Sequence, residues 1–167
     1  VHAASSAAAS AARSEPGSAG TSAPASESAL PPMVCLTFDD GPSRTTPAVL
    51  EALADEEVPA TFFVVANENN ERYLPLIRQA QQAGHEIALH SASHRYSDIY
   101  RSTDAFWADI ELLRQRIAPY ADAAAVSCLR FPGGSTNTVS RKYGGDAIMQ
   151  DLKAQAEARG WRWVDWN

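Results

Sequence analysis

The sequence predicts an α/β protein with a parallel sheet. After Pro31, short apolar runs alternate with amphipathic helical segments, and repeated strand–helix units favour parallel strands joined by crossovers. Five apolar runs and four helical segments can be distinguished. A complete (β/α) barrel needs more strands than these, so we expect either an open sheet or a distorted (β/α) barrel that is incomplete at the C-terminus.

Each apolar run is short and nearly continuous, as a strand buried on both faces should be. The five predicted strands are 33–38, 60–66, 85–90, 125–131 and 161–166. The four predicted helices are 45–57, 71–84, 103–120 and 146–160. In the first helix we expect Thr46 as N-cap and Pro47 at the first helical position. The third helix has the clearest apolar stripe, at Phe106, Ile110, Leu113 and Ile117.

Composition divides the chain at about residue 30. Residues 1–30 consist mostly of Ala, Ser, Gly, Pro, Thr and Glu, which cannot bury enough apolar surface to offset the entropy of ordering. We expect a flexible linker at 1–30 and one catalytic domain at 31–167. Such linkers are common in exported proteins, so we expect an extracellular or cell-wall-facing location, with tethering through an upstream segment absent from this sequence.

The net charge of the chain limits the classes of partner that it can bind. The net charge is −6 and the isoelectric point about 5.1, which argues against a nucleic-acid partner and against tight docking on anionic lipid. No run approaches the roughly 18 apolar residues of a membrane span. The chain starts at Val1 without a signal-peptide pattern, which predicts a fragment or a processed form.

The two cysteines, Cys35 and Cys128, both lie in apolar runs. We expect two buried thiols that behave as small hydrophobic side chains. A disulfide between them stays open as an alternative, if their strands are neighbours and their side chains face each other.

Ionisable residues follow four of the five predicted strands, where the carboxyl ends of parallel strands meet at one edge of a sheet. Each alone has an ordinary structural explanation: a turn or cap aspartate, surface histidines or a structural ion pair. Their collection at one edge favours a functional site instead. The residues are Asp39, Asp40, His90, His94, Arg130 and Asp165.

These residue types fit a metal site. His90 and His94 are four residues apart, which on one helical turn would place both imidazoles on one face. One of Asp39 and Asp40 can supply the third ligand, and the other can act as general base. Arg130 can hold a carboxylate ionised. The glycines of "FPGG" offer backbone N–H groups for an oxyanion. The set predicts metal-assisted hydrolysis of a carbonyl derivative.

The segments "TFDDGPS", "HSASH", "RFPGG" and "WVDW", in that order, resemble the first four motifs of the polysaccharide deacetylases of carbohydrate esterase family four. The resemblance covers about residues 33–167 and implies a distorted (β/α) barrel. It implies Asp39 as general base, held by Arg130, and one divalent metal ion, usually zinc. It implies the metal ligands Asp40, His90 and His94, the Gly133 N–H at the oxyanion, Asp165 orienting a catalytic histidine, and Trp166 lining an acetyl pocket.

Two departures from the family pattern stand out. Many relatives carry Tyr where this chain has Gly133. We expect little loss of activity from this difference, because the backbone N–H rather than the side chain would stabilise the oxyanion. The family's fifth motif, with its general-acid histidine, would lie beyond Asn167. Of the remaining histidines, His2 is in the linker and His85 opens a strand. We therefore expect a C-terminally truncated chain that is weakly active or inactive.

The resemblance implies an N-deacetylase acting on N-acetylglucosamine-containing polysaccharide, with peptidoglycan as the first choice and chitin oligomers next. A xylan O-deacetylase is an alternative within the same class. A non-catalytic carbohydrate-binding relic of the same fold is the alternative from another class. Trp161 and Trp163 are expected in the core rather than in the site.

Overall fold

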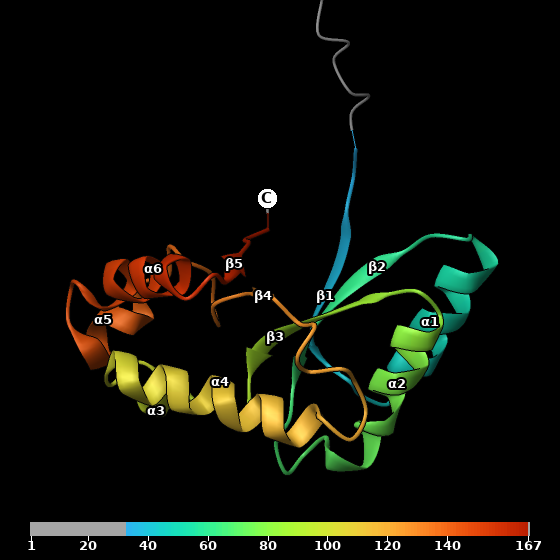
Figure 1. The fold of residues 1–167 in the computed structure, drawn as a ribbon, viewed down its shortest axis with the longest axis horizontal. Coiled ribbons are helices and arrows are strands. Elements are labelled where there is room, and N and C mark those ends of the chain that lie inside the picture. Colours follow the sequence, from blue (N-terminus) through green and yellow to red (C-terminus); the bar gives the residue numbers. More distant parts are fainter. Residues whose placement is uncertain (1–32, 167) are drawn as a thin grey trace, which may run out of the picture. The chain divides into compact units, whose positions relative to one another are not determined.

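The computed structural model describes residues 33–166, which build a five-stranded parallel sheet with helices packed against it (Figure 1). The strand order is β1-β2-β3-β4-β5. The strands are β1 Leu36–Gly41, β2 Ala60–Val65, β3 Glu86–Ser91, β4 Cys128–Leu129 and β5 Arg162–Trp163. The predicted α/β class with a parallel sheet is confirmed. The linker predicted at 1–30 lies outside the described residues.

The helices follow the predicted alternation with some shifts. They are α1 Thr46–Asp55, a 3-10 helix η1 Glu71–Tyr73, α2 Pro75–Gln82, α3 Tyr96–Ile99, α4 Thr103–Ile117, α5 Val139–Gly144 and α6 Ile148–Ala158. The predicted helix 71–84 is split into η1 and α2. The second part begins at Pro75, because proline is tolerated in the first turn of a helix. The N-cap of α1 is Thr45; the prediction of Thr46 was wrong by one residue. The Oγ1 of Thr46 instead accepts a hydrogen bond from Ser43 N at 2.8 Å.

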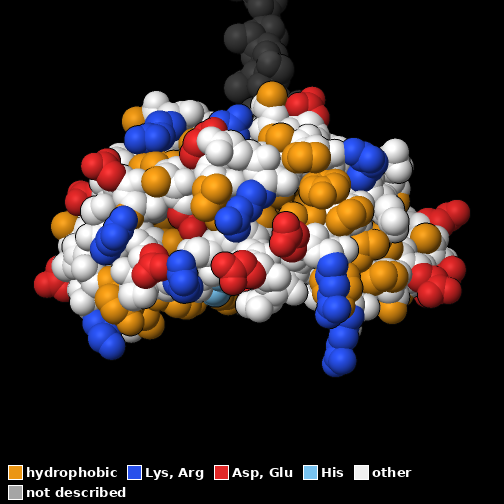
Figure 2. All heavy atoms as spheres, turned by 90° about the horizontal axis from the view of Figure 1, so that it is seen from below, with side chains coloured by type: hydrophobic (Ala, Val, Ile, Leu, Met, Phe, Trp, Pro, Cys, Tyr) orange, Lys and Arg blue, Asp and Glu red, His pale blue; other side chains and the backbone are white. Residues whose placement is uncertain are grey.

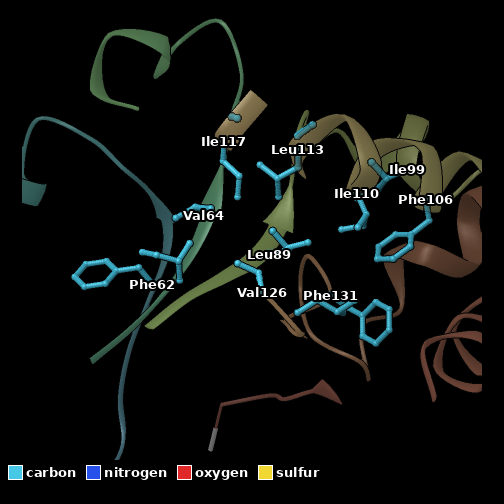
Figure 3. Close-up of a cluster of buried hydrophobic side chains, with 14 of the residues drawn as sticks. Phe62, Val64, Leu89, Ile99, Phe106, Ile110, Leu113, Ile117, Val126 and Phe131 are labelled. Atoms are coloured by element: carbon cyan, nitrogen blue, oxygen red, sulfur yellow. The ribbon is translucent and has the colours of Figure 1, made fainter. Parts of the chain in front are cut away.

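The main core lies between the sheet and the helices (Figure 3). The predicted apolar stripe of α4 is confirmed, because all four of its residues are buried. Successive residues of a strand point to opposite faces, so alternate residues of β2 and β3 meet this stripe. Figure 3 shows Phe62, Val64 and Leu89 of the sheet with Ile110, Leu113 and Ile117 of α4.

The opposite face of the sheet carries a second, smaller cluster of Phe63, Ala88 and Cys128. These residues alternate with those of the main core, so the sheet is apolar on both faces, as parallel sheets usually are. Trp161 and Trp163 pack partly buried against the main core, as predicted.

The sheet is open but strongly curved. Within residues 33–166, β1 pairs only with β2 and β5 only with β4, so both are edge strands. Yet Nη1 of Arg130, just after the fourth strand, lies 3.1 Å from Oγ1 of Thr37 on the first. One side chain can bridge the first and fourth strands only if the sheet curls as a barrel wall does.

Three strand predictions were displaced. The first strand was expected at 33–38 but runs through both aspartates to Gly41, because its pairing with β2 continues there. Met33 and Val34 are exposed rather than buried. The fourth strand was expected at 125–131 but comprises only Cys128–Leu129, since Leu129 alone is in register with β3. The fifth strand was expected at 161–166 but comprises only Arg162–Trp163, the two residues in register with β4.

The two thiols differ from the prediction that both are buried. Cys128 is buried, but Cys35 is exposed, because it precedes the first residue paired with β2. Both cysteines are free in the structure, so the alternative of a disulfide is not supported.

This difference predicts unequal thiol reactivity. In the folded protein, Cys35 is expected to react rapidly with an aromatic disulfide reagent, whereas Cys128 reacts only after unfolding. Burial raises the pKa of the Cys128 thiol and also blocks access. Absorbance of the released thiolate gives both rates, and Cys35→Ser should remove the fast phase. Equal rates for both thiols without denaturant would contradict the placement of Cys128.

The surface shown in Figure 2 carries acidic and basic side chains interspersed with hydrophobic ones. Within the part of the chain that the structure describes, no helix is both long and apolar enough to cross a membrane.

Candidate metal centre

The two adjacent aspartates at the end of β1 point to different partners because the strand is irregular between them. Asp39 is in register with Phe63 and Gly41 with Val64, so Asp40 is left out of the pairing. Asp40 has φ 64°, in the left-handed region that Asp enters more readily than most residues. A bulge of this kind re-aims a side chain and is common beside active sites.

His90 lies at a similar irregularity in β3. Val64 is in register with Leu89 and Val65 with Ser91, so His90 is skipped. Its Nδ1 donates to the carbonyl oxygen of Arg130 at 2.7 Å. That hydrogen bond fixes the proton on Nδ1 and leaves the Nε2 lone pair free toward the site.

The protonation of His90 suits a metal ligand. The side chain is 2 % exposed. Burial lowers the pKa of His90, an effect opposed by the hydrogen bond to the Arg130 carbonyl and by the charges of Asp39 and Asp40. A lowered pKa favours the neutral imidazole, which is the form that binds a metal.

His94 reaches the site from a loop, not from a helix. The prediction that His90 and His94 share one helical turn was wrong, because the chain leaves β3 at Ser91 and α3 begins only at Tyr96. His94 has φ 52°, and its backbone N–H donates to Oγ of Ser91 at 2.8 Å. This turn brings the two imidazole rings to a centroid distance of 5.1 Å.

The structure brings Asp40, His90 and His94 together. Oδ1 of Asp40 lies 3.5 Å from Nε2 of His90 and 3.2 Å from Nε2 of His94. The three ligand atoms all lie within 4.8 Å of one another. Two imidazole nitrogens and one carboxylate oxygen form a donor set that suits zinc with an open coordination position. The Asp40 side chain is 63 % exposed, so the centre is open on one side.

Asp39 is held by a buried arginine. Nη1 of Arg130 donates to Oδ1 of Asp39 at 2.6 Å, and the guanidinium also donates to the carbonyl oxygens of Val164 and Asp165, each at 3.3 Å. The guanidinium carbon lies 4.0 Å from the ring centroid of Phe63. These contacts orient the Asp39 carboxylate beside the metal ligands.

The predicted residues of the third and fourth motifs meet at the turn after β4. Gly133 and Gly134 have φ 78° and 81°, and a Cβ on Gly134 would lie 3.4 Å from the Trp166 ring. The guanidinium carbon of Arg130 is 5.3 Å from the centroid of the same ring, and Trp166 is 52 % exposed. The backbone N–H of Gly134 donates to Phe131 O at 2.7 Å.

Asp165 binds a serine in this structure. Its carboxylate accepts hydrogen bonds from Ser135 N at 2.9 Å and from Ser135 Oγ at 2.6 Å. The role implied by the resemblance, orientation of a catalytic histidine, therefore stays a prediction. His85 does not lie at this edge of the sheet, because it precedes β3 and its Nδ1 accepts a hydrogen bond from Ala60 N at 3.3 Å.

Sequence reasoning missed three residues around the centre. Thr37 and Ser135 complete the hydrogen bonding of Arg130 and Asp165, and short polar residues of this kind give no pattern of their own. Tyr96 packs edge-on against the His94 ring, at a centroid distance of 5.5 Å. A Cβ on Gly133 would lie 2.9 Å from the Tyr96 hydroxyl, and the φ of 78° at this position is one that residues with a side chain rarely adopt.

Fold and site together define an α/β protein with a two-histidine, one-carboxylate centre at the carboxyl ends of parallel strands. A family model described as polysaccharide deacetylase matches residues 27–150. The chain therefore belongs to the polysaccharide deacetylase family.

Individual relatives agree with this assignment. The catalytic domain of peptidoglycan N-acetylglucosamine deacetylase from Eubacterium rectale is 42% identical, with a TM-score of 0.74 over 80% of this chain and 59% of that one. A CE4 esterase from Streptococcus mutans is 30% identical, with a TM-score of 0.64 over 80% of this chain and 55% of that one. A chitooligosaccharide deacetylase from Rhizobium leguminosarum bv. trifolii is 30% identical over 80% of this chain and 56% of its own length. The chain thus spans little more than half the length of these relatives.

Proposed function

We propose that the protein is a metal-dependent N-deacetylase of N-acetylglucosamine-containing polysaccharide, with peptidoglycan as the first choice of substrate. The observation that carries this proposal is the convergence of Asp40, His90 and His94 within 4.8 Å, beside an aspartate held by Arg130. The substrate class is supported by the relatives named as peptidoglycan and chitooligosaccharide deacetylases.

The three ligands would hold one divalent cation, with zinc as the expected metal. When bound, the cation polarises the acetyl carbonyl and lowers the pKa of water at the site. The neutral state of His90 and the open side at Asp40 suit both tasks, because the cation needs ligand lone pairs and the substrate needs access.

Asp39 would accept the proton from the attacking water. Its Oδ1 lies 2.6 Å from Nη1 of Arg130, which fixes its position. Because Asp40 belongs to the ligand set, the proposed base is next in sequence to a metal ligand. The backbone N–H of Gly133 would stabilise the oxyanion that develops on the carbonyl, and Trp166 would border the acetyl group. Hydrolysis of the amide would then release acetate and leave a free amine on the sugar, with the proton taken up by Asp39 passed to the leaving nitrogen.

The test is acetate release from peptidoglycan, chitin oligomers and acetylated xylan, with the purified protein and added zinc. We expect slow release from the first two, lost on chelation and restored by zinc. Asp39→Asn should remove it, because Asn cannot take the proton, whereas exposed Asp55→Asn should not. Release that survives both chelation and Asp39→Asn would contradict the proposal.

Two further outcomes separate the alternatives. Binding of zinc and of sugar oligomers without any acetate release would contradict catalysis and favour a carbohydrate-binding protein. Preferential release from acetylated xylan would replace the N-deacetylase with an O-deacetylase. A location outside the cell, facing the wall, is part of the proposal, since peptidoglycan is found there.

A further inference from the structure

We propose that Asp109, on α4, is a positioning residue that holds the loop after β3 in the conformation that presents His94 to the metal. This inference rests on the proposed metal site. It concerns a residue outside the four motifs, in the middle of a helix whose other face builds the core.

The carboxylate of Asp109 accepts three hydrogen bonds from one short stretch of loop. Oδ2 accepts from Oγ of Ser91 at 2.6 Å and from N of Ala92 at 2.7 Å. Oδ1 accepts from N of Ser93 at 3.0 Å. One carboxylate thus satisfies the backbone donors of two consecutive residues that have left the sheet.

The chain of contacts continues to His94. Oγ of Ser91 donates its proton to Asp109 and accepts the backbone N–H of His94 at 2.8 Å. Because its proton goes to the carboxylate, the serine oxygen presents a lone pair to His94. Asp109 therefore fixes which way the Ser91 hydroxyl points, and that direction fixes the backbone of His94.

His94 needs such support, because its φ of 52° is unfavourable for a residue with a Cβ. A strained conformation persists only when its surroundings over-determine it. The support is rigid: on either side of Asp109 in α4, Phe106, Ile110 and Leu113 are buried in the core. Groups that orient a metal ligand typically change metal affinity by about 10–100-fold when they are removed.

The experiment measures zinc affinity by competition with a chromophoric chelator, for the wild type, Asp109→Asn and Ser91→Ala. Asp109→Asn keeps the shape but places an NH₂ group against a loop donor. Ser91→Ala keeps the charge of Asp109 but removes the relay to His94. Both should weaken zinc binding by about 10–100-fold.

The matched control is Asp98→Asn. Asp98 lies in α3 close to the same loop and pairs with Arg95 at 2.9 Å, but its side chain is half exposed, and its carboxylate accepts a hydrogen bond from Ser97 rather than from residues 91–94. The Asp98→Asn substitution removes the same charge as Asp109→Asn without changing the loop. The zinc affinity of this variant should therefore stay within about threefold of the wild type. Thermal unfolding of each metal-free variant separates a change in folding from a change in affinity.

The outcomes are distinct. Wild-type zinc affinity in folded Asp109→Asn and Ser91→Ala would overturn the role of Asp109 alone. A drop in Asp98→Asn as large as in Asp109→Asn would also overturn it, since charge rather than loop geometry would be the cause. Failure of the wild type to bind zinc would overturn the metal site, and this inference with it.

Discussion

Zinc affinity is expected to fall by at least about 100-fold in Asp40→Asn, more than for any residue that acts through another. Asn is nearly the same shape and also tolerates the left-handed backbone that Asp40 adopts, with φ 64°. The substitution therefore removes the charged ligand oxygen while preserving the bulge in β1. The neutral amide binds zinc far more weakly than a carboxylate does.

Isothermal titration of the metal-free protein with zinc measures this effect. Asp55→Asn, an exposed aspartate at the end of α1, is the matched control and should bind zinc as the wild type does. An Asp40→Asn protein that binds zinc as tightly as the Asp55→Asn protein would exclude Asp40 as a ligand. His90→Ala should lose zinc binding in the same assay.

Replacement of Arg130 by Met is expected to lower the free energy of unfolding by about 3 kcal/mol, since removal of one partner of a buried ion pair costs roughly 3–5 kcal/mol. The value lies at the lower end because the Asp39 side chain remains 26 % exposed and keeps some hydration. Arg130 itself is 2 % exposed. Its guanidinium joins β1 to the segment after β5, so its loss frees both edges of the curved sheet.

Urea unfolding of the metal-free protein measures this difference. Arg162→Met is the matched control: Arg162 pairs with Glu86 at 3.2 Å, but both side chains are more than half exposed. Its loss should cost less than about 1 kcal/mol. Equal destabilisation by the two substitutions would contradict a structural role for the buried pair.

Much of the fold could be predicted because its elements follow simple periodicities. The stripe of α4 recurs at helical spacing and is buried throughout, and the apolar run 60–66 gives β2 almost to the residue. The first strand was displaced because its end carries Asp39 and Asp40, which an apolar run excludes, although pairing with β2 continues at Asp39 and Gly41. The run 125–131 has strand-like composition, but β4 is only two residues long, because the chain up to residue 125 follows local turns instead.

The membership of the site could be predicted, but its construction could not. Parallel topology alone places the carboxyl ends of strands at one edge, which is why the aspartates, the two histidines and Arg130 meet there. The four-residue spacing suggested that one helical turn brings His90 and His94 together. In the structure a loop does so, with His94 in the left-handed conformation. The backbone irregularities at Asp40 and His90 produce no periodic pattern in the sequence, because they depend on the register of each strand with its neighbour.

The side chains that support the site were hidden for a related reason. Thr37, Ser135 and Asp109 are ordinary polar residues in the sequence, and each acts through a contact with a residue distant in the chain. Such contacts form only when the sheet has curled and α4 has packed on it, so the sequence alone does not indicate them. The exposure of Cys35 likewise depends on where pairing with β2 begins.

Anomalous X-ray diffraction at the zinc absorption edge, from crystals grown with zinc, tests the central claim most directly. The account predicts one strong anomalous peak bonded to the Asp40 carboxylate and to Nε2 of both His90 and His94, with the Asp39 carboxylate nearby on Arg130. A zinc peak bound elsewhere, or these three side chains without shared density in zinc-saturated crystals, would contradict it.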